Sequence, residues 1–436
     1  MFARLRLAAS AAAPRLRSAA LGVGALGLAG APIALCHGHN PNDTARIERL
    51  EKQVEFLKTI LSEQFDVCET TGQEGAIFSW DRQKTAAFPK EAKPFEAGMH
   101  GGFSEDPATG IVYTGIPGAG FFAISPDLMT WSKLGSDERL KDNIHGLTVF
   151  KHEGQTRIAA ACNETNAVLI IGLDGEVLQE LRQPAGGEFN FDEANLYYSQ
   201  RPRQQVPWRP DAGDRPAFAC TDVCYTDGRL YVVTGYCEGD FVLSASCDTE
   251  GVWKWGPLAW GGKGTGPGKF QTAHGIFTHD DRIFVANREA HQVLEFTTTG
   301  TLVRAMPDIP DTARICNLAK TDDWYVMNAL EPIGGLPGKV APIYAHTGER
   351  LLSTIEPGQL GIPVLKHLHH VWPHYVKEPT GERRLYILMH GWSAGKYAVL
   401  RHEPNGKPSV PTGWTGTDSK PANYTAKPGQ PVEFKG

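Results

Sequence analysis

The feature that most constrains this chain is a repeat of strand-forming units within residues 144–304. The segments IHGLTVFKHEGQTRIAAACNETNAVLIIGLDGEVL and AHGIFTHDDRIFVANREAHQVLEFTTTGTLV both open on His-Gly and an apolar residue, and Asn163 or Asn287 ends the second strand of each. Alternating apolar residues between turn-forming residues are typical of short antiparallel strands. Repetition at roughly 40 residues per unit, built from strands, predicts a β-propeller.

The full repeat predicts an all-β, six-bladed β-propeller over residues 75–402, a length that can bury a large core. A long insertion at 182–219, rich in Pro, Arg and aromatic residues, is expected to separate the second and third blades and to be either functional or disordered. Residues 403–436 are Pro-, Gly- and Lys-rich without periodicity, which indicates a flexible tail. The inner strands are predicted to begin near Met99, Ile144, Cys220, Ala273, Ile315 and Pro373.

Charge and cysteine content exclude some classes of function. With 43 Lys and Arg against 49 Asp and Glu, the net charge is −6, so no nucleic-acid partner is expected. Four of the eight cysteines (Cys220, Cys224, Cys237 and Cys247) lie within a short stretch. This crowding favours a local disulfide and an oxidising compartment. A four-cysteine metal site is less favoured, because the stretch holds no C-x2-C pair.

Residues 1–42 have the composition of a targeting segment. They contain several arginines and no acidic residue, as in a mitochondrial presequence. The uncharged run from Ala19 to Cys36 is at the lower limit of length for a membrane span. Two interpretations stay open. One is a two-part mitochondrial signal leading to the inner membrane or intermembrane space. The other is a secretory signal or membrane anchor, with the rest of the chain membrane-anchored or lumenal.

The next segment, residues 43–66, is predicted to form a short coiled-coil helix. Its apolar residues follow a 3-4-3-4 spacing: Ile47, Leu50, Val54, Leu57 and Leu61. Such a helix either lies across the propeller or forms a small stalk that joins copies of the chain through residues 43–64. The stalk is slightly favoured because the segment follows a candidate membrane anchor.

Three histidines take the same place in alternate blades. His145, His274 and His374 are each predicted at the start of an inner strand, in the second, fourth and sixth blades. A three-fold arrangement would bring them together at the central channel. Three imidazoles with an open fourth position form a typical catalytic zinc site. His100 in the first blade has the same His-Gly opening. It is either a further lining residue, or a sign that the histidine serves the repeat and not a metal.

Two further polar residues follow the second strands of neighbouring blades. Tyr236 lies in a G-Y-C turn of the third blade, and Arg288 lies in N-R-E of the fourth. A tyrosine beside zinc can act as a general base if its pKa is lowered. An arginine nearby can grip a substrate carboxylate with two parallel hydrogen bonds. Taken singly, each residue is more often a surface packing residue.

Residues 144–304 resemble the catalytic core of peptidyl-α-hydroxyglycine α-amidating lyase, above all in CTDVCYTDGRLYVVTGYCEGD and GKFQTAHGIFTHDDRIFVANREAHQVLEF, and the resemblance returns at VWPHYV. It implies an NHL-type propeller with a three-histidine zinc site. Under this resemblance the zinc ligands are His145, His274 and His374, the catalytic residues are Tyr236 and Arg288, and a disulfide links Cys237 to Cys220 or Cys224.

The sequence also departs from this family. An arginine that grips substrate in the family's first blade is missing from GIVYTGIPGAG, where Ile116 and Pro117 stand. The family's calcium-binding Asp corresponds to Tyr375, which leaves a calcium site in doubt. No copper-monooxygenase segment accompanies the propeller, so only the second half of amidation is implied.

Two hypotheses follow for the function. The first is a zinc-dependent lyase that cleaves an α-hydroxyglycine-type carbinolamide of a small peptide-derived substrate to an amide and glyoxylate. The second is a catalytically altered propeller that acts as a membrane-anchored scaffold or interaction subunit for a protein partner. The three histidines and Tyr236 favour the first, and the missing first-blade arginine favours the second.

Overall fold

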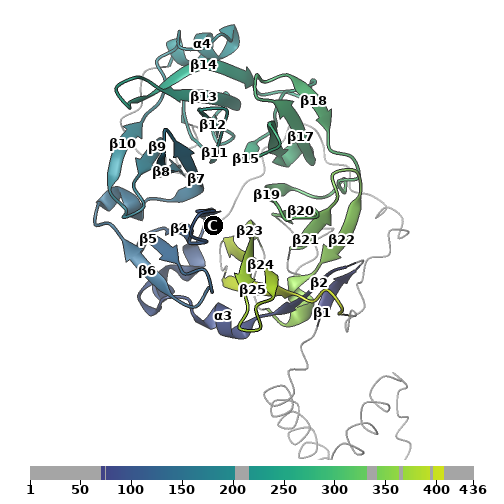
Figure 1. Cartoon of the computed structure of the whole chain (residues 1–436). Coiled ribbons are helices and arrows are strands. Elements are labelled where there is room, and N and C mark those ends of the chain that lie inside the picture. The colour runs from purple at the N-terminus through teal and green to yellow at the C-terminus, as the bar shows by residue number, and fades with distance from the viewer. Residues whose placement is uncertain are drawn as a thin grey trace, which may run out of the picture. The chain divides into compact units, whose positions relative to one another are not determined.

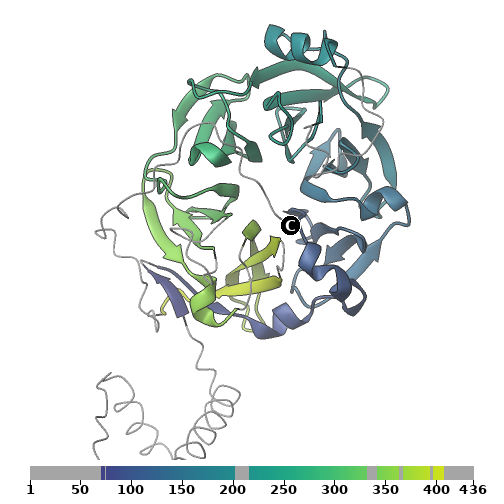
Figure 2. The same cartoon turned by 180° about the vertical axis from the view of Figure 1, so that it is seen from behind.

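The protein is a six-bladed β-propeller, which confirms the predicted fold class. The structure, a computed structural model, describes residues 70–73, 75–201, 216–330, 341–362, 367–392 and 396–406. Within these ranges the strands form six antiparallel sheets, five of four strands and one of five. Figures 1 and 2 show the sheets arranged as blades around a central axis, with β7, β11, β15, β19 and β23 innermost.

The strands and helices follow the chain in blade order. The first three blades contain β3 (Phe103–Glu105), β4 (Val112–Ile116), β5 (Gly120–Ile124), β6 (Trp131–Leu134), β7 (Ile144–His152), β8 (Gln155–Cys162), β9 (Ala167–Ile171), β10 (Val177–Leu181), β11 (Asp222–Thr226), β12 (Arg229–Val233), β13 (Phe241–Cys247) and β14 (Trp253–Gly261). The last three contain β15 (Ala273–His279), β16 (Arg282–Asn287), β17 (Gln292–Thr297), β18 (Leu302–Ala305), β19 (Ile315–Lys320), β20 (Tyr325–Ala329), β21 (Ile343–His346), β22 (Leu351–Ile355), β23 (His367–Lys377), β24 (Arg383–Trp392) and β25 (Tyr397–His402), with β1 (Thr70–Gln73) and β2 (Ala76–Trp80) added to the sixth. The helices within the described ranges are α3 (Arg82–Ala86), α4 (Asp192–Ser199), η1 (Lys90–Gly98), η2 (Glu138–Lys141), η4 (Arg288–Ala290) and η6 (Pro357–Leu360).

The sixth blade joins the two ends of the propeller. Its strand order is β1-β2-β25-β24-β23, so the earliest strands form the outer edge of the last sheet. Strand β2 pairs antiparallel with β25, with Phe78 opposite His402 and Trp80 opposite Leu400. This pairing closes the ring, and the sequence repeat alone did not predict it.

The core lies between neighbouring blades. The middle strands are buried on both faces, and β9 (AVLII), for example, exposes none of its side chains. The outer strands are more open: in β18 partly buried residues alternate with exposed ones, and none is fully buried. This difference follows from the fold: a middle strand is covered by a blade on each side, whereas an outer strand faces water. The apolar runs of the repeat are therefore explained by contact between blades.

The predicted starts of the inner strands hold for Ile144, Ala273 and Ile315. The strand expected near Pro373 instead begins at His367 and contains Pro373 in its middle. Proline lacks a backbone N–H, which argues against a strand interior. Here β23 is the innermost strand and pairs only with β24, so one side of its backbone needs no partner and the proline is tolerated.

In the described part of the insertion, residues 182–201 and 216–219, the structure has the helix α4 and no strand of the blade sheets. The predicted targeting segment (1–42), the helix at 43–66 and most of the tail lie outside the described residues. Among the helices that the structure does describe, none has the length and apolar character needed to cross a membrane.

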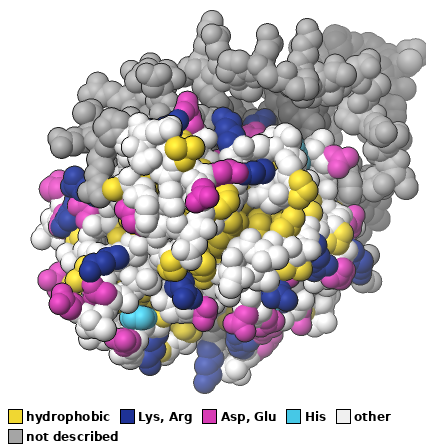
Figure 3. All heavy atoms as spheres, turned by 90° about the horizontal axis from the view of Figure 1, so that it is seen from above, with side chains coloured by type: hydrophobic (Ala, Val, Ile, Leu, Met, Phe, Trp, Pro, Cys, Tyr) yellow, Lys and Arg dark blue, Asp and Glu magenta, His cyan; other side chains and the backbone are white. Residues whose placement is uncertain are grey.

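The outer surface mixes apolar and charged side chains. In Figure 3 a band of apolar side chains runs between acidic and basic ones. The large apolar side chains that are exposed among the described residues are Phe95, Leu178, Leu196, Val252, Val303 and Trp392. Of these, Trp392 also contacts the histidine cluster described next.

Candidate metal centre

Four inner strands carry the same irregularity near their beginning. In β7 the pairing passes from Ile144 to Gly146 and skips His145. The same shift skips His274 in β15, Cys316 in β19 and His369 in β23. A bulge of this kind leaves the extra residue out of the ladder and redirects its side chain. The second, fourth, fifth and sixth blades therefore each present one potential metal ligand from an equivalent position.

Three imidazoles converge from alternate blades. The ring centroids of His145 and His274 are 4.8 Å apart, and those of His369 lie 4.7 Å from His145 and 4.8 Å from His274. Each of the three residues is only 2% exposed. This triangle has the blade pattern that the sequence predicted, but its third member is His369.

His374 lies apart from the cluster. It follows His369 by five residues on β23, about 16 Å along an extended strand. One ring nitrogen, Nδ1, lies 2.8 Å from the Glu105 carboxylate, and the other, Nε2, lies 2.8 Å from the carbonyl oxygen of Pro126. Both nitrogens are thus engaged by groups outside the cluster. The prediction of His374 as a ligand beside His145 and His274 is corrected to His369.

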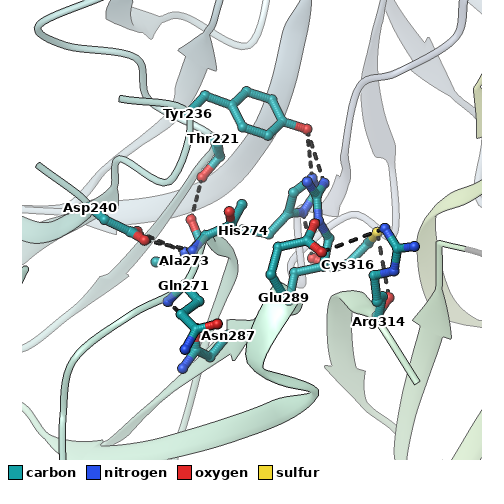
Figure 4. Close-up of polar contacts among 12 residues, drawn as sticks. Thr221, Tyr236, Asp240, Gln271, Ala273, His274, Asn287, Glu289, Arg314 and Cys316 are labelled. Atoms are coloured by element: carbon teal, nitrogen blue, oxygen red, sulfur yellow. Dashed lines mark hydrogen bonds and ion pairs between the residues drawn. The ribbon is translucent and has the colours of Figure 1, made fainter. Parts of the chain in front are cut away.

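The Tyr236 hydroxyl lies within hydrogen-bond distance of two imidazoles of the cluster. Tyr236 lies in the turn after β12, and its hydroxyl oxygen is 2.9 Å from His274 Nε2 and 3.2 Å from His145 Nε2. A guanidinium nitrogen of Arg288 donates to the same oxygen at 3.3 Å. Figure 4 shows the Tyr236 hydroxyl above His274, with the contact to that ring drawn as a dashed line. The structure therefore brings together Tyr236, Arg288 and two of the predicted histidines.

Backbone carbonyls set the orientation of these rings. His145 Nδ1 donates to the carbonyl oxygen of Thr221 at 2.5 Å, and His274 Nδ1 donates to that of Cys316 at 2.8 Å. Each Nε2 is then the nitrogen with a lone pair. The Tyr236 hydroxyl has one hydrogen and can satisfy only one of them. The second lone pair remains available to a metal, and this is how metal-binding histidines are usually oriented.

Neighbouring hydrogen bonds fix the backbone next to His274. The Asp240 carboxylate accepts from the Ala273 N–H at 2.8 Å and from the Thr272 N–H at 2.6 Å. The Thr221 hydroxyl donates to the Ala273 carbonyl oxygen at 2.8 Å (Figure 4). The start of β15 is thus tied to the third blade, which fixes the position of its imidazole relative to Tyr236.

Burial keeps the cluster uncharged. The pKa of His145 is lowered to about 3, mainly by burial; the Thr221 hydrogen bond opposes this shift and the charge of Arg288 adds to it. The pKa values of His274 and His369 are also lowered by burial and by neighbouring cations or imidazoles. Neutral imidazole is the form that binds metals. For Tyr236, burial raises the pKa and Arg288 opposes the shift, so without a metal the phenol is not the activated base that the sequence suggested.

His100 and Cys316 complete the cluster. Potential ligand atoms lie within 4.8 Å of one another in two groups, His100 with His145 and His369, and His274 with Cys316 and His369. The His100 ring stacks on Trp392 with centroids 5.3 Å apart. His100 is thus a lining residue, as one interpretation held. Cys316 was missed, although it follows Ile315 at a strand start just as His145 follows Ile144.

The predicted disulfide is wrong for this structure. Cys220, Cys224 and Cys237 are all free thiols. Cys220 packs in the core between the second and third blades, whereas Cys224 belongs to the core between the third and fourth. The Cys237 thiol donates to the Thr234 carbonyl oxygen. Closeness in sequence does not make a disulfide here: Cys220 and Cys224 belong to different cores, and the Cys237 thiol donates to a backbone carbonyl.

A further pair of buried imidazoles lies near the cluster, and one of them makes the stability of the protein depend on pH. The His370 and His390 rings stack with centroids 6.2 Å apart, and His390 Nε2 donates to the Gly101 carbonyl oxygen. Burial lowers the pKa of His390 to about 4, and the Gly101 hydrogen bond opposes the shift. The unfolded chain takes up this proton near pH 6.5, so stability is lost as pH falls from about 6.5 toward 4.

We therefore expect His390→Gln to flatten the pH dependence of stability. Glutamine keeps a donor for Gly101 and cannot take up the proton. Between pH 7 and pH 4 the unfolding free energy of the variant should fall by about 3 kcal/mol less than that of the wild type. Urea unfolding at several pH values measures this difference. Equal pH slopes for the two proteins would contradict the assignment.

The residues at the cluster fit a metal ion. The donors are neutral imidazole nitrogens and a thiol, which suit zinc among the common divalent ions. His369 Nδ1 is buried and has no hydrogen-bond partner among the described residues. An unpaired buried nitrogen is costly, and coordination would relieve it. The buried histidine and cysteine group can thus hold a metal ion.

Comparisons with known proteins add a likeness of fold. No protein family and no curated protein matches the sequence. Solved structures that resemble the chain include a luciferin-regenerating enzyme (12% identity, TM-score 0.44, 73% of this chain and 94% of that one). A second is a streptogramin B lyase (10% identity, TM-score 0.39, 70% of this chain and 94% of that one). The third is a nidogen–laminin complex (10% identity, TM-score 0.41, 70% of this chain and 96% of that one). These likenesses concern the propeller alone.

Proposed function

We propose that the protein is a zinc-dependent lyase that cleaves an α-hydroxyglycine-type carbinolamide to an amide and glyoxylate. The observation that carries the proposal is the meeting of two imidazole Nε2 atoms and a guanidinium at the Tyr236 hydroxyl. His145, His274 and His369 would hold the metal. When bound, zinc would act as a Lewis acid toward the substrate hydroxyl.

Tyr236 and Arg288 have distinct parts in this proposal. The Arg288 guanidinium binds the substrate carboxylate, as the planar fork of arginine allows. Its Nε also bonds the Glu289 carboxylate at 2.9 Å, which orients the side chain. Tyr236, in its ionised form, accepts the proton of the substrate hydroxyl. Because burial raises the pKa of Tyr236, the nearby positive charges of Arg288 and of the metal are needed to favour that form.

The reaction balances without an oxidant or reductant. The substrate O–H bond breaks as its proton passes to Tyr236, and a C=O bond forms at the same carbon. The C–N bond breaks, its electron pair moves to nitrogen, and the proton held by Tyr236 completes the amide N–H. One carbinolamide thus gives one amide and one glyoxylate, and Tyr236 returns to its starting state.

The scaffold hypothesis keeps one observation in its favour. At the position of the family's substrate-gripping arginine, the end of β4 carries Ile116, which is fully buried, followed by Pro117. Neither can bind a carboxylate. A propeller that retains the metal and lacks turnover would fit this alternative.

Tyr236→Phe tests the proposal. The variant removes the hydroxyl and keeps the ring, so zinc binding should persist while turnover of a peptidyl-α-hydroxyglycine falls by about 10²–10⁴-fold. Zinc content and glyoxylate release are the two measurements. The matched control is Tyr225→Phe, whose hydroxyl contacts His152 instead of the cluster and whose loss should leave the rate unchanged. A metal-loaded wild type without any turnover would favour the scaffold.

A further inference from the structure

The fifth blade offers the same ligand position as the histidine-bearing blades. The bulge that skips His145, His274 and His369 also skips Cys316 in β19. A bulge redirects the extra side chain away from the ladder. Cys316 is therefore placed by the same backbone device as the three imidazoles. The third blade has no such bulge at the start of β11.

Cys316 also shares their surroundings. It lines one internal pocket together with His145, His274 and His369. Its sulfur and one ring nitrogen each of His274 and His369 all lie within 4.8 Å of one another. Cys316 is fully buried; its thiol makes a long contact of 3.9 Å with the Arg314 carbonyl oxygen, and the Arg288 side chain also interacts with it. The His274 ring is hydrogen-bonded to the backbone carbonyl oxygen of Cys316, so the backbone of Cys316 positions both this ring and its own thiol.

We infer that Cys316 is a ligand of the metal centre, so that the site is a mixed imidazole–thiolate site and not one of imidazoles alone. The inference rests on the proposed function only in assuming that the cluster holds a metal. On binding, the S–H bond breaks, a sulfur–metal bond forms, and the proton leaves to solvent. Arg288 favours the anionic sulfur, because its positive charge acts on the Cys316 thiol against the effect of burial.

A thiolate changes what the site can do. A centre with neutral imidazoles alone would keep the full double charge of zinc, whereas one thiolate reduces the net charge by one. The group that contains Cys316 offers two imidazoles, those of His274 and His369, so with the thiolate it leaves one position of a tetrahedral zinc open. A thiolate further favours zinc over harder ions such as magnesium or calcium.

Cobalt substitution tests the inference directly. Co²⁺-loaded wild type should show a thiolate-to-cobalt charge-transfer band in the near ultraviolet together with visible ligand-field bands. Cys316→Ser should lose the first and keep the second. The zinc affinity of this variant should also fall. The expected loss is larger than the roughly 10–100-fold seen when a residue that only hydrogen-bonds to a metal ligand is removed. The control is Cys224→Ser, a buried cysteine that faces another part of the core.

A proton count gives a second readout. Near pH 7 zinc binding should release one more proton from the wild type than from Cys316→Ser, since only the thiol must ionise. If Cys316→Ser does not fold, as judged by circular dichroism, Cys316→Ala replaces it.

The outcomes separate this inference from the proposed function. Ligand-field bands without a charge-transfer band in the wild type would overturn the thiolate and leave an imidazole-based lyase standing. A charge-transfer band without lyase turnover would support the thiolate and count against the lyase. A wild type that takes up no cobalt would reject both.

Discussion

His369→Ala should abolish metal binding and lyase turnover together, whereas His374→Ala should leave both in place. The two histidines belong to the same strand, and the sequence predicted His374 as the third ligand. In the structure His369 lies 4.7 Å from His145 between ring centroids, while both nitrogens of His374 are bonded to groups elsewhere. Loss of a ligand removes at least one of the bonds that hold the ion.

Metal content after dialysis and glyoxylate release measure this prediction. His374→Ala serves as the matched control, since it makes the same change five residues away. Thermal unfolding of both variants shows whether each is folded, because His374→Ala removes the contacts with Glu105 and Pro126. Metal loss in His374→Ala with retention in His369→Ala would refute the assignment.

Phe78→Ala should destabilise the propeller by about 3–5 kcal/mol, the usual cost of emptying a buried phenylalanine site. Phe78 is fully buried on β2 and meets Trp324 of the fifth blade edge to face, with ring centroids 6.1 Å apart. The variant therefore weakens both the closing strand pair and the contact between the last two blades.

Urea unfolding measures the effect, and Phe95→Ala is the control. Phe95 is 39% exposed, so its truncation should change the unfolding free energy by only about 0.5 kcal/mol. Equal effects of the two changes would show that β2 is not needed for closure.

The sequence predicted the ring but not every position within it. Repeated apolar strands and turns identify six blades, because blade packing imposes that pattern on each unit. Strand β23 was harder to place, since HLHHVWPH offers several histidines and a proline where a strand boundary is expected. Only the bulge between Leu368 and His370 decides which imidazole turns inward. A bulge depends on pairing with β24, which no single-strand pattern reveals.

The candidate site shows the same limit. Tyr236 and Arg288 follow equivalent strands, so their position beside the histidines could be predicted from the repeat. Cys316 could have been found from its place after Ile315. It was missed because the equivalent position in the second, fourth and sixth blades carries a histidine, and the predicted ligands were all histidines. The cysteine pairing failed for a different reason. Cys220 and Cys224, the two candidate partners of Cys237, belong to different cores, and the Cys237 thiol donates to the Thr234 carbonyl oxygen; neither fact can be read from sequence spacing.

The closing sheet also sets the order in which this domain can be completed during synthesis. Strand β2 is made early, yet its partner β25 ends at His402, so Phe78 waits for more than 300 residues before it pairs with His402. Until then the growing chain carries an unpaired strand edge and an uncovered apolar side chain, both of which promote association between nascent chains. A folding assistant that shields the first strands until the last has emerged would therefore raise the yield of this protein more than one that acts after release.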